Sequence, residues 1–168
     1  MKYTFKKLKD SDIDLAYELH CELVNDMLNR GIKQWLRPID KCKVLARQEK
    51  NENYGLFNQK GVLKVFLSLV ARSDYHEWDA WFTIKPTTWL NTVSVNINNS
   101  KKGLGQVAIK EACSYLKGEG EEELYLDCVV GDGFLINYYQ KLGFVIIGET
   151  RATYRSGTFD LVLMKKSL

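Results

Sequence analysis

A strand pattern that runs through a glycine-containing turn into a long amphipathic helix is the feature that most restricts this chain. Residues 89–97 alternate between apolar and polar side chains, and one face carries a row of branched residues: Val93, Val95 and Ile97. Residues 103–117 repeat their apolar side chains at the spacing of one helical face. A strand followed by a crossover helix is the unit from which mixed α/β sheets are built.

The remaining patterns predict further strands and helices around this unit. Ser11 is expected to cap a first helix, which Gly31 ends. A second, more polar helix is expected over 38–49, and a short one over 134–142. Further strands are expected at 3–8, 53–57, 61–70, 124–130, 144–149 and 159–165, while 73–88 is either a strand or an ordered loop. The chain is therefore expected to be one α/β (α+β) domain over residues 1–168, with at least one parallel crossover.

The composition agrees with one globular domain and excludes several classes of protein. The chain has 168 residues, of which 45% are hydrophobic and 27% charged, as in ordinary folded domains. Its net charge of +3 is too small for a nucleic-acid-binding face. No apolar run is long enough to cross a membrane, and the N-terminus lacks the apolar core of a signal peptide. We expect a cytoplasmic protein with no nucleic-acid or membrane partner.

The cysteines predict no metal site. They are scattered, no C-x-x-C pair occurs, and neither His20 nor His76 stands at zinc-ligand spacing. We expect reduced, mostly buried thiols at all four positions: Cys21, Cys42, Cys113 and Cys128. A Cys-His nucleophile pair stays an alternative, because catalytic partners meet in space and not in sequence.

The turn at residues 99–106, Asn-Ser-Lys-Lys-Gly-Leu-Gly-Gln, is a candidate site for an anion such as a diphosphate. Gly103 and Gly105 let the backbone approach a ligand, and the first N–H groups of the following helix have no acceptor inside it. The helix dipole, Lys101 and Lys102 add positive potential. The alternative interpretation is that the glycines only ease a tight turn and that the lysines are solvated.

A second segment, residues 138–144, reads Tyr-Tyr-Gln-Lys-Leu-Gly-Phe. With Ser-Lys-Lys-Gly-Leu-Gly at 100–105, it resembles the GCN5-related N-acetyltransferase (GNAT) superfamily. Members of that superfamily show R/Q-x-x-G-x-G/A at the start of their long helix and F/Y-Y-E-K-L-G-F later in the chain. The chain departs from the family at Ser100, which replaces Arg or Gln, and at Asp132, which replaces Asn. The resemblance implies a central mixed, largely antiparallel sheet, splayed around a parallel strand pair and flanked by about four helices.

The resemblance also implies acetyl-CoA as cosubstrate, a primary amine as acceptor and direct attack of that amine on the thioester. The departing thiolate needs a proton, a role that the resemblance gives to Tyr139; Tyr138 is the alternative. A backbone N–H near Val95 is the expected donor to the thioester carbonyl. Residues expected to contact the cofactor are Val95, Ile97, Lys101, Lys102, Gly103, Leu104, Gly105 and Gln106.

The acceptor side is less defined by the sequence. Trp35 and Trp81 are expected to wall a pocket, whereas Trp89 is expected in the core. The candidate general bases are three carboxylates, with a water relay as the alternative: Glu77, Asp79 and Asp127. The acceptor is expected to be a small-molecule or peptide amine, and the protein a monomer or homodimer.

Two other functions compete with this interpretation. The first is a non-catalytic sensor or scaffold that has the same fold and binds acyl-CoA without turnover. The second is a nucleotide-binding α/β domain, in which the glycine turn holds a different phosphate.

Overall fold

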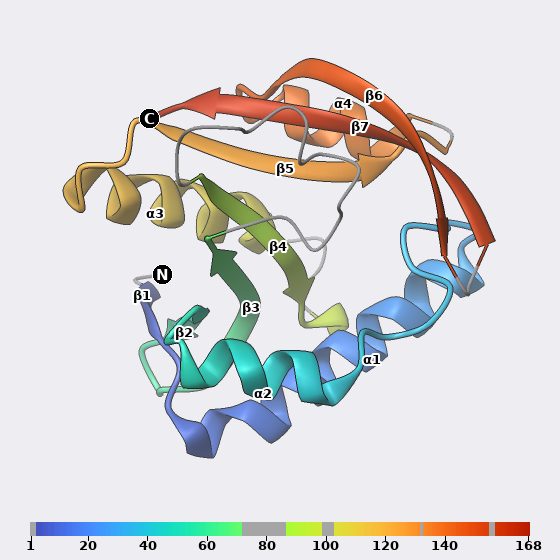
Figure 1. The fold of residues 1–168 in the computed structure, drawn as a ribbon. Helices are drawn as coiled ribbons and strands as arrows, with labels where there is room; N and C mark the ends of the chain where they lie inside the picture. Colours follow the sequence, from blue (N-terminus) through green and yellow to red (C-terminus); the bar gives the residue numbers. More distant parts are fainter. Residues whose placement is uncertain (1–2, 72–86, 99–102, 132, 155–156) are drawn as a thin grey trace.

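The fold is built on one mixed sheet. The structure is a computed structural model and describes residues 3–71, 87–98, 103–131, 133–154 and 157–168. The strand order is β1-β2-β3-β4-β5-β7-β6 (Figure 1). These strands are β1 (Tyr3–Lys7), β2 (Asn53–Asn58), β3 (Leu63–Val70), β4 (Thr88–Val95), β5 (Glu123–Val129), β6 (Val145–Tyr154) and β7 (Gly157–Ser167). Among these described strands, only β4 and β5 pair in parallel; the other neighbours are antiparallel.

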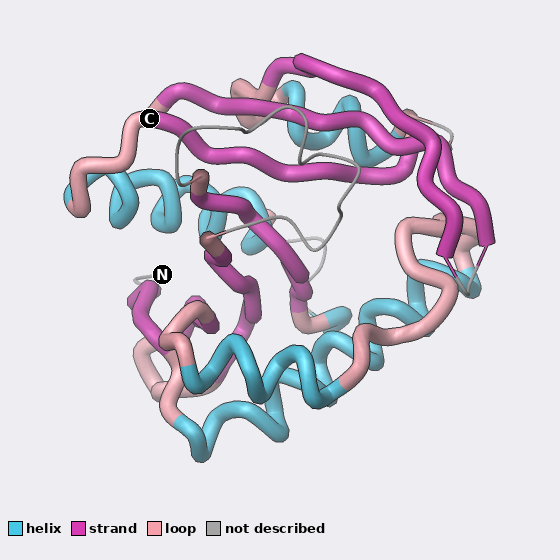
Figure 2. The backbone as a smooth tube through the Cα atoms, in the orientation of Figure 1, coloured by secondary structure: helices cyan, strands magenta, loops and turns pink. Residues whose placement is uncertain are grey.

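Four helices accompany the sheet within the described residues: α1 (Ile13–Asn29), α2 (Lys41–Glu49), α3 (Leu104–Gly118) and α4 (Phe134–Gln140). α3 and α4 pack on one face, where the largest apolar cluster joins Ala108 and Ile109 to Leu56 and Val65. α1 and α2 lie side by side over the other face, where a second cluster gathers around Phe66 (Figure 2). The expected mixed, largely antiparallel sheet around one parallel pair, with about four helices, is confirmed.

The start of the first helix differs from the sequence prediction. Ser11 does not cap it but lies inside a 3-10 turn, Asp10–Asp12, that precedes α1. The Asp12 carboxylate accepts the backbone N–H of Lys9 at 2.9 Å, so an aspartate fixes the entry of the chain instead. Gly31 does end the helical region, because it takes a φ of +76° directly after α1.

The last two strands are longer than predicted. The sequence predicts strands over 144–149 and 159–165, whereas β6 and β7 form a long hairpin. Its outer part is mostly polar, and the few apolar residues there, such as Ala152 and Phe159, give too weak an alternation to indicate strands in the sequence. The far end of the hairpin lies beside the connection between α1 and α2 (Figure 1), where Leu36 approaches Gly157. Most of the stretch 73–88 lies outside the described residues.

The cysteines are free thiols, as expected, but only Cys128 is buried and Cys42 is exposed. Burial raises the pKa of the Cys128 thiol to about 12, so this sulfur stays protonated. No three described His, Cys, Asp or Glu side chains come together as metal ligands. Among the helices that the structure describes, none is long and apolar enough to span a membrane.

Candidate active site

The parallel strands β4 and β5 separate almost as soon as they meet. They pair only at Thr88 with Leu124 and at Trp89 with Tyr125. Beyond these two pairs the strands diverge (Figure 1), so the later residues of β4 have no partner on β5. Backbone groups of β4 that point away from β3 therefore face an opening in the sheet, where an extended amide-containing ligand can bind as an additional strand.

β4 also contains a bulge. The pairing of β3 with β4 shifts register between Phe66 and Ser68, and β4 accommodates an extra residue between Asn91 and Ser94. Within it, Thr92 has a φ of +54°, in the left-handed region. A bulge bends its strand and increases the local twist, which accounts for the divergence of β4 from β5.

A cavity of about 410 Å³ occupies the opening and is lined by five parts of the chain. β4 contributes Leu90 to Val93 and Val95, and β5 contributes Asp127. α3 and the residue before it contribute Gly103, Gly105 and Gln106, and α4 contributes Phe134, Leu135, Tyr138 and Tyr139. The remaining wall is α1 with the loop that follows it: Leu23, Met27, Arg30, Ile32, Gln34 and Trp35.

The start of α3 requires its glycines. Gly103 precedes the helix with a φ of +66° and, as a glycine, has no side chain that could cap the first turn. The first-turn N–H groups therefore stay available to a ligand. A Cβ on Gly105 would lie 2.7 Å from the Tyr138 hydroxyl oxygen and 3.2 Å from a Val95 methyl group. Only glycine lets the helix, the end of β4 and Tyr138 approach so closely.

The cofactor-contacting residues predicted from the sequence fall into three groups. Val95, Gly103, Gly105 and Gln106 all line the cavity. Leu104 turns its side chain into the core, and Ile97 follows the end of β4 instead of lying in the strand. Lys101 and Lys102 lie outside the described residues, as do Ser100 and Asp132.

Tyr138 and Tyr139 from α4 both reach the cavity. Their rings meet edge to face at 5.2 Å, and Tyr139 packs in the same way against Phe144 at 5.8 Å. Burial raises the pKa of Tyr138 to about 12. The pKa of Tyr139 is raised further, first by burial and then by the neighbouring Cys128, Tyr138 and Asp127. Both phenols therefore keep their proton at neutral pH, and each hydroxyl can act as a hydrogen-bond donor at the cavity.

The loop after α1 forms the wall opposite α4. Trp35 lines the cavity and packs edge-on to His20, with ring centroids 5.1 Å apart. Gln34 Oε1 accepts the backbone N–H of Val129 at 3.0 Å, which attaches this loop to the end of β5. Of the candidate bases, Asp127 lies in the wall, whereas Glu77 and Asp79 are outside the described residues.

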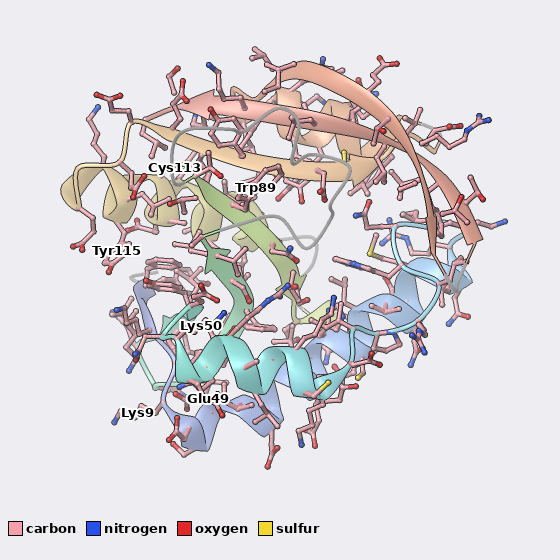
Figure 3. All side chains as sticks on the ribbon, viewed as in Figure 1. Lys9, Glu49, Lys50, Trp89, Cys113 and Tyr115 are labelled. Atoms are coloured by element: carbon pink, nitrogen blue, oxygen red, sulfur yellow. The ribbon has the colours of Figure 1, made fainter. Side chains whose placement is uncertain are left out.

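The two remaining tryptophan predictions have different outcomes. Trp89 is 3% exposed and packs against Tyr125 in the core, as predicted (Figure 3). Its indole N–H donates to the Thr87 hydroxyl at 2.8 Å. Trp81, predicted as a pocket residue, is outside the described residues.

A buried polar network lies behind β4, and sequence reasoning missed it. Arg47 from α2, 5% exposed, donates to the Thr92 hydroxyl at 2.9 Å. The fully buried His20 of α1 is 2.9 Å from the hydroxyl of Ser94 and accepts the backbone N–H of Ile39 at 3.2 Å. With that nitrogen an acceptor, His20 is neutral and donates through Nδ1 to Ser94. Burial, and then the charge of Arg47, lowers the pKa of His20 to about 4.

Only one of these residues left a signal in the sequence. His20 stands four residues after Ala16 and four before Val24, two fully buried positions of α1, so helical periodicity indicates its burial. Arg47 lies in a polar helix and has the pattern of a solvated residue. A glycine or asparagine would have indicated positive φ at position 92, but threonine does not.

The comparisons with known proteins point to one family. The profile of the acetyltransferase (GNAT) family matches residues 44–144. No curated protein matches the chain. Among solved structures, a GNAT-family acetyltransferase from Listeria monocytogenes is similar with a TM-score of 0.81 and 19% identity, covering 99% of this chain and 95% of that one.

Two further solved structures have similar folds. The ribosomal-protein-S18-alanine N-acetyltransferase from Escherichia coli gives a TM-score of 0.71 at 17% identity, covering 99% of this chain and 94% of that one. The yncA protein from Salmonella typhimurium, solved with its cofactor acetyl-CoA, gives 0.70 at 16% identity, with the same coverages of 99% and 94%. At such identities these similarities establish the fold.

Proposed function

Because this chain belongs to the acetyltransferase (GNAT) family, we propose that it is a single N-acetyltransferase domain over residues 1–168, and that it moves the acetyl group of acetyl-CoA to a primary amine by direct attack. One observation carries the proposal: the opening between β4 and β5 is bordered by the first turn of α3 on one side and by the α4 tyrosines on the other. One cavity thus contains a candidate anion-binding site, an unpaired strand edge and a candidate proton donor.

The cavity fits the chemical groups of acetyl-CoA. No side chain projects from Gly103 or Gly105, so the first-turn N–H groups and the helix dipole can hold the diphosphate. The amide-rich pantetheine arm would extend along β4 toward Val95, where the backbone has no partner on β5. Lys101 and Lys102 adjoin this turn in sequence and are proposed to supply charge.

The residues around the cavity divide the chemical work. Acetyl-CoA supplies an activated acyl carbon, and the neutral amine forms a bond from its nitrogen to that carbon as the carbon–sulfur bond breaks. A backbone N–H of β4, between the bulge and Val95, would donate to the carbonyl oxygen as negative charge develops there. Tyr139 would donate its phenolic proton to the departing sulfur. The attacking nitrogen gives up its extra proton to Asp127 or to water.

The acceptor is proposed to enter from the side of α1 and its following loop. Trp35 and Asp127 line the cavity there, and an aromatic face with a carboxylate suits a cationic amine. One similar structure is named for an alanine of a ribosomal protein, which illustrates a protein amine as acceptor. We propose a small-molecule or peptide amine as acceptor, a monomeric or homodimeric state and a cytoplasmic location.

Release of the CoA thiol in the presence of amines tests the proposed function. The assay would offer acetyl-CoA with small polyamines, amino acids and peptides that have free N-termini. We expect thiol release that depends on both the protein and one class of amine. Tight binding of acetyl-CoA with no turnover by any amine would instead support the non-catalytic sensor or scaffold. Stronger stabilisation by ATP than by acetyl-CoA would support a nucleotide-binding domain.

A further inference from the structure

Thr92 has a backbone conformation that threonine rarely adopts. Its φ is +54°, and a β-branched residue stays in the left-handed region only where the surrounding contacts impose it. The residue belongs to the β4 bulge, and together with Asn91 and Val93 it lines the cavity. The strain therefore lies in the wall of the proposed transfer site.

Arg47 holds the side chain of Thr92. The guanidinium Nη1 donates to Thr92 Oγ1 at 2.9 Å, and Oγ1 in turn donates to Asn91 Oδ1 at 2.8 Å. With one bond accepted and one donated, the hydroxyl has a fixed orientation. Because Arg47 is 5% exposed and Thr92 3%, water does not compete for these bonds.

The position of Arg47 is itself fixed by neighbouring strands. Its Nη1 lies 3.5 Å from the hydroxyl of Ser68, which donates to Asn53 Oδ1 at 2.9 Å. The Asn53 amide donates back to the carbonyl of Val44 in α2, also at 2.9 Å. The network thus begins and ends on α2 and includes β2, β3 and β4.

A second contact holds β4 two residues further on. His20 donates to the Ser94 hydroxyl at 2.9 Å, and Ser94 Oγ lies 3.5 Å from the carbonyl oxygen of Thr92. Both contacts come from the face opposite α3. The bulge is therefore held from one face of β4, by a side chain of α1 and a side chain of α2.

We propose that Arg47 is a positioning residue for acetyl transfer: it fixes the left-handed conformation of Thr92, and with it the direction of the β4 N–H groups that face the acetyl carbonyl. This inference rests on the proposed function. Arg47 itself does not line the cavity, so it acts through Thr92. An apolar side chain of similar size would fill the same volume without the cost of burying a charge, so the guanidinium contributes geometry more than stability.

The first test compares Arg47→Met with a control, Ile13→Ala, in the neighbouring helix α1. Ile13 is 3% exposed and belongs to the apolar cluster around Phe66, but it takes no part in the network and does not line the cavity, so this variant lowers the melting temperature without loosening the bulge. For Arg47→Met we expect kcat to fall by about 10- to 100-fold, since small misplacements of reacting groups have effects of this size. KM for acetyl-CoA should change by less than about threefold, because the α3 turn is untouched. For Ile13→Ala, kcat should stay near the wild-type value.

The second test uses Thr92→Gly. Glycine adopts a φ of +54° without strain, so it does not need the guanidinium to hold it. Arg47→Met should therefore reduce kcat less in the Thr92→Gly protein than in the wild type. Arg47→Gln, which keeps a donor, should have an intermediate kcat and provides a second variant if Arg47→Met does not fold.

Each result decides the inference. Wild-type kcat in Arg47→Met, or a matching loss of kcat in Ile13→Ala, would overturn it and leave the proposed function standing. Equal effects of Arg47→Met in the wild-type and Thr92→Gly proteins would also overturn it. If the wild-type protein turns over no amine, the proposed function fails and this inference fails with it.

Discussion

The two faces of β4 are built from different chemistry. Toward α3, Val93 and Val95 join a continuous apolar cluster. Toward α1 and α2, Thr92 and Ser94 are buried and bind polar side chains from both helices. One face of β4 therefore packs against the apolar core, and the other face is held in place by hydrogen bonds.

This difference separates stability from geometry. Apolar burial has no preferred direction and contributes in proportion to the area removed from water, so it stabilises the sheet without fixing an angle. Hydrogen bonds weaken steeply when they are misaligned, so a buried set of them specifies one conformation. No buried side-chain nitrogen or oxygen in the described residues lacks a partner, as such a network requires. We infer that the polar face keeps the bulge in place while the apolar face and the cavity serve the cofactor.

The largest effect is expected for Tyr139→Phe, on the cofactor side of this comparison. If its hydroxyl protonates the departing sulfur, kcat should fall by roughly 10²- to 10⁴-fold, the usual contribution of a general acid. The ring and its packing on Phe144 remain, so the melting temperature and the affinity for acetyl-CoA should change little. Steady-state kinetics at saturating acetyl-CoA measure this.

Tyr138→Phe is the matched control for that variant, because both rings line the cavity and contact each other. It should reduce kcat much less than Tyr139→Phe. A large loss in Tyr138→Phe alone would transfer the acid role to Tyr138. Normal turnover in both variants would leave the proton to water or to a backbone donor.

The next largest effect is expected for Gly105→Glu, at the cofactor turn. Its Cβ would meet the Tyr138 hydroxyl at 2.7 Å, and its carboxylate would repel a diphosphate held by the helix N-terminus. Acetyl-CoA binding, measured by calorimetry, should weaken by about 100-fold or more, or roughly 3 kcal/mol. Gly118→Glu is the control: it adds the same charge to the same helix, where nothing lies within 4 Å of the new Cβ. Normal binding by a folded Gly105→Glu protein would contradict the assignment of this turn.

The polar face of β4, where His20 contacts Ser94, should make the free energy of unfolding depend on pH in acid. The pKa of His20 is lowered to about 4, so between pH 6.5 and 4 only the unfolded chain takes up the proton. The stability that a neutral His20 contributes is complete above pH 6.5 and is lost as the pH falls through this window. The loss should be about 3 kcal/mol of unfolding free energy, measured by urea denaturation.

His20→Gln does not titrate in this range and is the control. The variant should lose distinctly less stability than the wild type between these two pH values. Parallel losses in both proteins would mean that other groups, and not the buried imidazole, cause the acid sensitivity.

The smallest effect is expected in alkali. Burial raises the pKa of Tyr138 to about 12 and that of Tyr139 further, so neither phenol loses its proton near the usual value of about 10. We expect kcat to hold steady as the pH rises from about 8 to about 10. A fall of kcat centred near pH 10, absent in Tyr139→Phe, would show a phenol with an unshifted pKa.

Much of the fold could be predicted from the sequence, because its main elements carry periodic patterns. The α3 stripe and the hairpin of β2 and β3 are local features, and both are observed. The outer half of the β6–β7 hairpin was missed, since most of its residues are polar and its few apolar ones, such as Ala152 and Phe159, give too weak an alternation to distinguish it from a loop.

The part of the candidate site at the start of α3 could be predicted, because it depends on the backbone and on two glycines, Gly103 and Gly105, which are visible in the sequence. The polar face was not predictable. Whether Arg47 is solvated or buried depends on where α2 packs against the sheet, which is a tertiary property. Likewise, the positive φ of Thr92 comes from contacts with residues far away in sequence, so no local sequence pattern predicts it.

Stabilisation of the wild-type protein by acetyl-CoA tests the central claim most directly, because it requires neither an acceptor nor a variant. At about 100 times its dissociation constant, a ligand that binds only the folded state contributes about 2.7 kcal/mol. For a chain of this length the melting temperature should rise by about 5 to 10 °C, and ATP at the same concentration should raise it less. No shift at millimolar acetyl-CoA, or a larger shift with ATP, would contradict the account.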